Sequence, residues 1–157
     1  MRRPPPEVVT FSVADLGAVT AQMAALVPRS GWLVLQPAFD AESAPAPRRT
    51  SGFFSSRGPY VPVASWVPGE RTRQGVEYTA VGVQHGAGSA VVDLLGERGH
   101  PLPTGWEVID DHPGRGLVVA VPPAAAHPDA LGWLLDAADH LCPVQLTGEW
   151  RATVHRR

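Results

Sequence analysis

The segment Val144–Val154, Val-Gln-Leu-Thr-Gly-Glu-Trp-Arg-Ala-Thr-Val, carries the clearest structural signal in the chain. Its even-numbered positions hold Val, Leu, Gly, Trp, Ala and Val, whereas its odd-numbered positions hold polar residues. Successive side chains of a strand point to opposite faces of a sheet, so this alternation predicts a strand with one buried face and one wet face. The sheet that contains this strand therefore needs a core on one side only.

The remaining sequence predicts the order β-α-β, long loop, β-β-α-β-β-α-β. The nearly continuous apolar run at 31–37 is typical of a strand covered on both faces, whereas Pro62 and Pro68 favour a short edge strand at 60–67. Ser12 and Asp15 form a possible capping box ahead of the first helix. This order predicts an α+β fold in which about three helices pack on a mostly antiparallel sheet. The expected strands are 7–13, 31–37, 60–67, 75–84, 106–110, 116–121 and 144–154, and the expected helices are 16–26, 90–98 and 128–141.

The length of 157 residues is typical of one domain. We expect a flexible N-terminus over residues 1–6 and a long loop, rich in Pro, Ser and Arg, over residues 38–58. All 13 basic residues are arginines, a usage that indicates a GC-rich bacterial genome. The net charge of −2 gives no general attraction to nucleic acid or to an anionic membrane.

We expect neither a secreted disulfide scaffold nor a signal peptide or membrane span in this chain. Cys142 is the only cysteine, which excludes an intrachain disulfide. The Met-Arg-Arg-Pro-Pro-Pro start lacks the apolar run of a signal peptide, and no stretch approaches the ~18 apolar residues of a membrane span. The sequence therefore predicts a cytoplasmic protein.

The segment Gln84–Ser89, Gln-His-Gly-Ala-Gly-Ser, joins a predicted strand to a predicted helix. Such a junction can direct backbone N–H groups at an anion, which the helix dipole also favours. Gly86, Gly88 and Ser89 are therefore candidate ligand-binding residues for an anionic group of the acyl-CoA or phosphate type, with His85 as a weak candidate base. The spacing fits neither a dinucleotide-binding motif nor a P-loop. The simpler interpretation is a tight turn with Ser89 as the helix cap.

Two short segments that contain aspartate and histidine are candidate metal sites. Asp136 and His140 are neighbours on one helix face, with Cys142 beyond the helix end. The run 110–112, Asp-Asp-His, precedes a Pro-Gly turn, and adjacent strand residues point in different directions. The ordinary interpretation of both groups is structural, so the sequence predicts no metal and no cofactor.

A positively charged segment covers residues 48–73, where five arginines and one glutamate give +4, while nine acids and two arginines over 74–147 give −7. Exposed arginine and aromatic side chains are typical of protein interfaces. We therefore expect Arg49, Phe54, Arg57 and Tyr60 to contact a partner. In the competing interpretation, the phenylalanines pin this loop to the core and the arginines pair with the acidic segment.

These features favour a non-enzymatic protein-binding or regulatory module of the inhibitor or immunity type. The alternative is a small enzyme or ligand-binding protein that holds an anionic group at the Gly86–Ser89 turn. Whether the protein is an enzyme stays open, although the lack of a convergent catalytic set favours a non-enzyme. The partner is expected to be another protein, or a second copy paired through the C-terminal strand, and neither nucleic acid nor a membrane.

Overall fold

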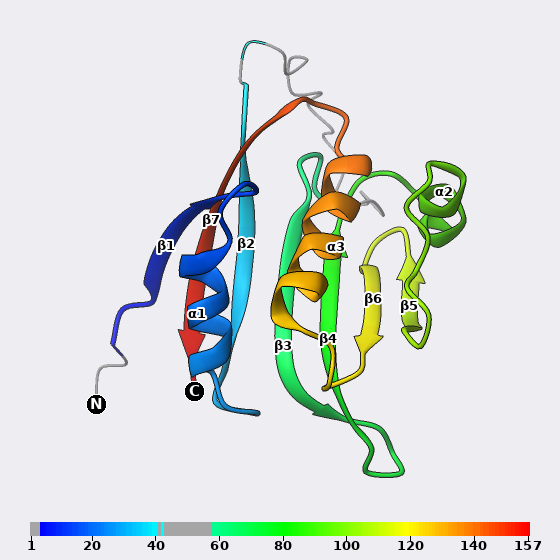
Figure 1. The fold of residues 1–157 in the computed structure, drawn as a ribbon. Helices are drawn as coiled ribbons and strands as arrows, with labels where there is room; N and C mark the ends of the chain where they lie inside the picture. The colour runs from blue at the N-terminus through cyan, green and yellow to red at the C-terminus, as the bar shows by residue number, and fades with distance from the viewer. Residues whose placement is uncertain (1–3, 41, 43–57) are drawn as a thin grey trace.

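The computed structural model, which describes residues 4–40, 42 and 58–157, contains a seven-stranded sheet in which every neighbouring pair of strands is antiparallel (Figure 1). The strand order is β1-β7-β2-β3-β4-β6-β5. Together with three described helices, this sheet confirms the predicted α+β class. The strands are β1 (Glu7–Ser12), β2 (Gly31–Phe39), β3 (Val63–Arg71), β4 (Glu77–Gln84), β5 (Glu107–His112), β6 (Gly116–Val121) and β7 (Leu146–Arg156), and the helices are α1 (Gly17–Ala25), α2 (Val91–Glu97) and α3 (His127–His140).

Strand β7 shows the predicted alternation of buried and exposed side chains, and it is an interior strand of the sheet. Trp150, Ala152 and Val154 are buried on one face, and Arg151 on the other is exposed. One edge of β7 pairs with β1 and the other pairs with β2. Because both edges are occupied, the expected pairing of the C-terminal strand with a second chain is wrong.

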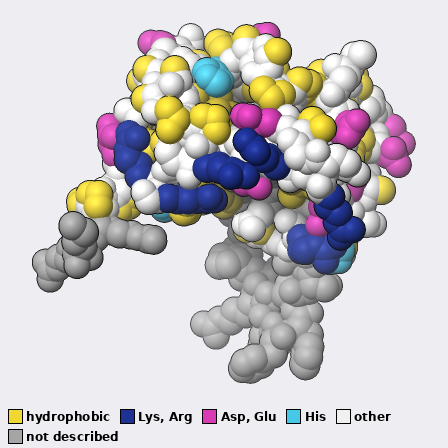
Figure 2. Space-filling model, turned by 90° about the horizontal axis from the view of Figure 1, so that it is seen from below, with side chains coloured by type: hydrophobic (Ala, Val, Ile, Leu, Met, Phe, Trp, Pro, Cys, Tyr) yellow, Lys and Arg dark blue, Asp and Glu magenta, His cyan; other side chains and the backbone are white. Residues whose placement is uncertain are grey.

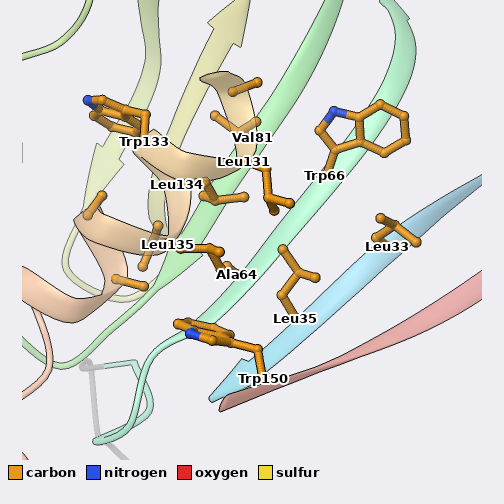
Figure 3. Packing of buried hydrophobic residues seen from close by; sticks show 14 of the residues in the cluster. Leu33, Leu35, Ala64, Trp66, Val81, Leu131, Trp133, Leu134, Leu135 and Trp150 are labelled. Atoms are coloured by element: carbon orange, nitrogen blue, oxygen red, sulfur yellow. The ribbon is translucent and has the colours of Figure 1, made fainter. Parts of the chain in front are cut away.

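The core lies on one face of the sheet, beneath α1 and α3 (Figure 1). Figure 3 shows Leu131 and Leu134 of α3 meeting side chains of the strands, among them Ala64 and Trp66 of β3. Pro128 stands in the first turn of α3, where a missing N–H is tolerated. Within the described residues, no helix has the length and apolar character needed to cross a membrane.

Strand β2 is buried on one face only. Leu33 and Leu35 are fully buried against the helices, whereas Trp32 and Val34 on the opposite face keep partial exposure. The expectation that both faces of this strand are covered was wrong. The described helices cover only the face of the sheet that carries Leu33 and Leu35. Apolar residues such as Trp32 therefore contribute to an accessible surface.

Strand β3 is an interior strand between β2 and β4, so the predicted edge position is wrong. Both prolines that suggested an edge avoid the regular ladder. Pro62 precedes the strand, and Pro68 lies at the irregularity where the β3–β4 register shifts between Val67 and Glu70. A bulge lets a proline sit in a sheet without breaking a regular hydrogen bond.

The predicted capping box at the start of α1 is also wrong. The N-cap residue of α1 is Leu16, whose side chain makes no capping hydrogen bond. Ser12 belongs to β1, and its hydroxyl accepts a hydrogen bond from Ala14 N–H at 3.1 Å. Asp15 accepts one from Gly17 N–H at 3.0 Å. The two side chains therefore shape the turn before the helix instead of capping each other.

Candidate functional site

The predicted partner-binding residues are only partly covered by the structure. Arg49, Phe54 and Arg57 lie outside the described residues. Tyr60 is half exposed, with 50% of its surface accessible, and it precedes β3. Arg71 and Arg73, from the same positively charged segment, lie at the other end of β3, ~26 Å away for a nine-residue strand. Among the described residues of this segment, Tyr60 and the two arginines therefore lie toward opposite ends of β3.

His85 is enclosed by the protein. Its side chain is 0% exposed, and its Nδ1 accepts a hydrogen bond from Ala87 N–H at 3.1 Å. That bond places the proton of the neutral ring on Nε2, which is buried without a partner among the described residues. Burial lowers the pKa of His85, and the Asp111 carboxylate partly opposes the shift. His85 is therefore shielded from solvent, and its surroundings disfavour the charged form of the ring.

The backbone beside His85 is closely packed against the segment that precedes Tyr60. A Cβ atom at Gly58 would lie 2.3 Å from the His85 carbonyl oxygen, a contact that no other residue type could make. Gly58 N–H also donates to the Pro113 carbonyl at 3.2 Å, in the turn between β5 and β6. Gly58 therefore packs directly against the backbone of His85 and is tied to the β5–β6 turn.

The start of α2 is held by a carboxylate from β5. Asp111 accepts hydrogen bonds from Val91 N–H at 3.2 Å and from Val92 N–H at 3.1 Å. Ala90, with a left-handed φ of 54°, precedes the helix and makes no side-chain cap, so the interpretation of Ser89 as the cap is wrong. An internal anion therefore occupies the helix amides next to the predicted Gly86–Ser89 ligand site.

The candidate metal ligands do not converge. Asp110 pairs with Arg115, which holds the pKa of the Asp110 carboxyl below its usual value. His112 Nδ1 instead accepts a hydrogen bond from Gly114 N–H at 2.9 Å, and the His140 ring lies 5.3 Å from that of His100. Within the described part of the chain, no group of three or more His, Cys, Asp or Glu side chains could hold a metal ion.

A different surface gathers arginines from three parts of the chain. Arg29 follows α1, and its N–H donates to the Pro68 carbonyl of β3. Arg157 N–H donates to the Ser30 carbonyl at 2.8 Å, which brings the residues after β7 to the start of β2. Seen from this end of the sheet, dark blue arginine side chains form a band across the molecule (Figure 2). We call this surface the arginine end; it comprises Arg29, Arg71, Arg73, Arg156 and Arg157, all exposed.

An aromatic stack adjoins the arginine end. Trp32 of β2 and His155 of β7 are cross-strand neighbours whose rings stack at 4.9 Å with an interplanar angle of 9°. The guanidinium carbon of Arg157 lies 5.7 Å from the centre of the Trp32 ring, within the range of a cation–π interaction. The stack restrains the Arg157 side chain before any partner binds.

Most arginine side chains of the arginine end form no ion pair with another described residue. Arg156 lies 3.8 Å from Glu7, the one ion pair found at this end among the described residues. Within the same part of the chain, Arg29, Arg71 and Arg73 have neither an ion pair nor a side-chain hydrogen bond. The acidic segment 74–147 supplies no ion pair to Arg71 or Arg73, in contrast to the competing interpretation of the sequence.

No local sequence pattern indicates this surface as a whole. Arg71 and Arg73 were noticed as part of the positive segment, but Arg29 and Arg157 are distant from them in sequence. The alternating pattern of β7 predicted a wet face for His155 without identifying Trp32 as its neighbour. In comparisons with protein-family models, curated proteins and solved structures, no match to this chain was found.

Proposed function

We propose that this protein is a non-enzymatic binding module that captures an acidic segment of a protein partner at the arginine end. The observation that carries the proposal is the set of exposed guanidinium groups of Arg29, Arg71 and Arg73, which lack ion pairs among the described residues. A guanidinium group binds a carboxylate in a bidentate manner, and it is more weakly hydrated than the ammonium group of lysine. Carboxylates of a partner would complete this surface.

The Trp32–Arg157 contact supports a role in recognition. Tryptophan and arginine are enriched among the residues that dominate the binding energy of interfaces. Because Arg157 is already held over the Trp32 ring, less side-chain entropy is lost when it engages a carboxylate. The pair would therefore provide an ordered anchor on the same surface as the exposed charges of Arg71 and Arg73.

An acidic protein suits this surface better than a nucleic acid. Glu7, Glu70 and Glu77 lie in β1, β3 and β4 close to the arginines, and Glu77 is the cross-strand neighbour of Arg71. These carboxylates would repel a continuous phosphate backbone, whereas a partner with mixed charges can avoid them. Such a partner would be met in the cytoplasm, the location that the sequence predicts.

The alternative function, an anionic ligand bound at Gly86, Gly88 and Ser89, has less support. Asp111 already accepts hydrogen bonds from the first amides of α2. A second anion placed there would be repelled by this carboxylate. The buried ring of His85 is also poorly placed to act as a base on a bound molecule.

A labelled peptide in which glutamates are separated by serines provides a direct test by fluorescence anisotropy. The variant Arg71→Ser/Arg73→Ser should bind it about 10-fold more weakly, the effect of ~1.4 kcal/mol of lost interaction. The matched control is Gln84→Glu/Gln145→Glu, which changes the net charge equally at exposed positions on the opposite end of the strands. We expect the control to bind within about twofold of the wild type, with affinity falling as salt rises.

Two results would contradict the proposal. One is equal loss in both double variants, because net charge alone would then explain the binding. The other is tighter binding of a single-stranded DNA oligonucleotide than of the glutamate–serine peptide under the same conditions. The thermal stability of the arginine variant should stay unchanged, since the substituted side chains are exposed and have no ion pair within the described residues.

A further inference from the structure

Strand β1 ends the sheet with backbone groups that point outward. It pairs with β7 on one side, in a register that places Val9 opposite Ala152 and Thr10 opposite Arg151. Val13 N–H donates to the Gly148 carbonyl at 2.9 Å, which extends the same register. Hydrogen-bonded pairs alternate with non-bonded pairs in an antiparallel ladder. Val9 and Phe11 therefore bond to β7, and Val8 and Thr10 direct their N–H and carbonyl groups away from the sheet.

This edge lacks the features that usually prevent strands from pairing with other chains. The sequence of β1, Glu-Val-Val-Thr-Phe-Ser, contains no proline, no lysine and one charge, and its register with β7 is regular. Val8 beside the edge is 53% exposed. The other edge strand, β5, has a register shift between Val108 and Asp110 and ends in Asp-Asp-His. Bulges and charges of that kind protect an edge, so β1 is the open one.

We propose that β1 pairs in an antiparallel manner with β1 of a second copy of this chain, so that two sheets join into one. A two-fold axis perpendicular to the sheet would keep the helices of both copies on the same side of the joined sheet. Each residue of β1 must then lie opposite a residue of the partner's β1 whose side chain points to the same face of the sheet. Pairing Thr10 with the partner's Thr10, and Val8 with the partner's Ser12, meets this condition. It uses the outward backbone groups that β7 leaves free.

The strand is complementary to itself in this register. Val9, which is only partly buried, would lie beside the partner's Phe11, so the two apolar cores would become continuous. The antiparallel arrangement separates Glu7 from the partner's Glu7, whereas a parallel one would bring both carboxylates together. Pro4, Pro5 and Pro6 precede Glu7 and cannot donate to a ladder, which limits pairing to the strand itself.

One short strand pair buries less surface than the ~1,200 Å² of a standard interface, so the dimer should form reversibly with concentration. This inference does not depend on Arg71 and Arg73, which lie on β3 and in the turn that follows it. The arginine end touches β1 through the Arg156–Glu7 ion pair, and neither set of variants changes that pair. Failure of one proposal would leave the other unaffected.

The test is the mass in solution measured by sedimentation velocity from ~10 µM to ~1 mM. The wild type should shift toward twice the mass of one chain as concentration rises. Thr10→Pro should remain monomeric, because it removes an outward N–H that makes no bond to β7. Thr10→Val keeps that N–H and is the matched control, so it should dimerise as the wild type does.

A second variant protects the test against misfolding of Thr10→Pro. Val8→Lys places a charge beside the pairing edge while leaving the backbone intact, and it should weaken dimerisation by at least about 10-fold. A wild type that stays monomeric throughout the range would overturn the proposal, even if β1 captured an unrelated extended peptide. Dimerisation of Val8→Lys and folded Thr10→Pro at the wild-type level would overturn it as well.

Discussion

The Oδ1 atom of Asp111 accepts a hydrogen bond from the backbone N–H of Val91 at 3.2 Å, across 20 residues of sequence. Its Oδ2 atom accepts a second from Val92 N–H at 3.1 Å. The first N–H groups of a helix have no partner within the helix, and they carry partial positive charge. Because Ala90 provides no side-chain cap, Asp111 stabilises the start of α2 and joins this helix to β5.

Replacing this carboxylate should destabilise the fold. Asp111→Ala is expected to lower the free energy of unfolding by about 1–2 kcal/mol, as the loss of a helix cap does. Urea denaturation of both proteins at neutral pH measures the difference. Asp93→Ala is the control, since Asp93 is an exposed acid in the first turn of the same helix. An equal loss in the control would mean that the negative charge matters and the two hydrogen bonds do not.

His85 makes stability depend on pH. Because burial lowers the pKa of His85 in the folded protein below its ordinary value of 6.5, the unfolded chain takes up the proton first as the pH falls. The contribution of His85 is therefore complete above pH 6.5 and is lost as the pH falls from there toward the folded-state pKa. Urea denaturation on both sides of pH 6.5 should show a lower free energy of unfolding on the acid side.

The variant His85→Asn isolates this contribution. Its side-chain oxygen can accept the Ala87 N–H bond that Nδ1 accepts in the wild type, but asparagine does not titrate. The acid-induced loss of stability should be smaller in this variant. His112→Asn is matched to it, because His112 Nδ1 accepts a comparable bond from Gly114 N–H in a less buried position. If both variants changed the pH dependence equally, the assignment to His85 would be wrong.

Gly116 at the start of β6 should tolerate no side chain. Its φ is +88°, and a Cβ atom would lie 2.4 Å from the Val83 carbonyl oxygen. Gly105 has a nearly identical φ of +87° with nothing within 4 Å of its Cβ position. Gly105→Ala should therefore cost about 1–2 kcal/mol for the backbone alone, and Gly116→Ala at least about 3 kcal/mol because overlap is added. Equal losses of Tm in the two variants would show that β4 and β6 are less closely packed at this point.

Local patterns predicted most of the secondary structure. The alternation in β7 and the apolar stripe of α3 are repeated over enough residues to outweigh single exceptions. The position of β3 was missed because Pro62 and Pro68 are judged locally, whereas the bulge that accommodates Pro68 exists only in the assembled sheet. Local patterns did not predict the strand order either, because β7 follows every other strand in sequence but lies between the early strands β1 and β2.

The candidate site was less predictable because it depends on contacts between distant segments. The Asp111 cap of α2 spans 20 residues, and its sequence context, Asp-Asp-His before Pro-Gly, resembles an ordinary turn. Trp32 and His155 belong to the first and last thirds of the chain and meet only through the β2–β7 register. Spacing along the sequence cannot reveal such pairs. The arginine content of the chain was visible, but its gathering at one end was not.

The interior position of β7 has a consequence for biosynthesis. Glu7 pairs with Val154, and β7 is the one strand beside β1 in the described sheet, so β1 has no place there until β7 has been synthesised. Strand β2, in contrast, can already pair with β3. The nascent chain must therefore keep β1 unpaired while the residues from β2 to β7 are made, and the sheet is completed late. Slow, chaperone-sensitive folding is the expected result.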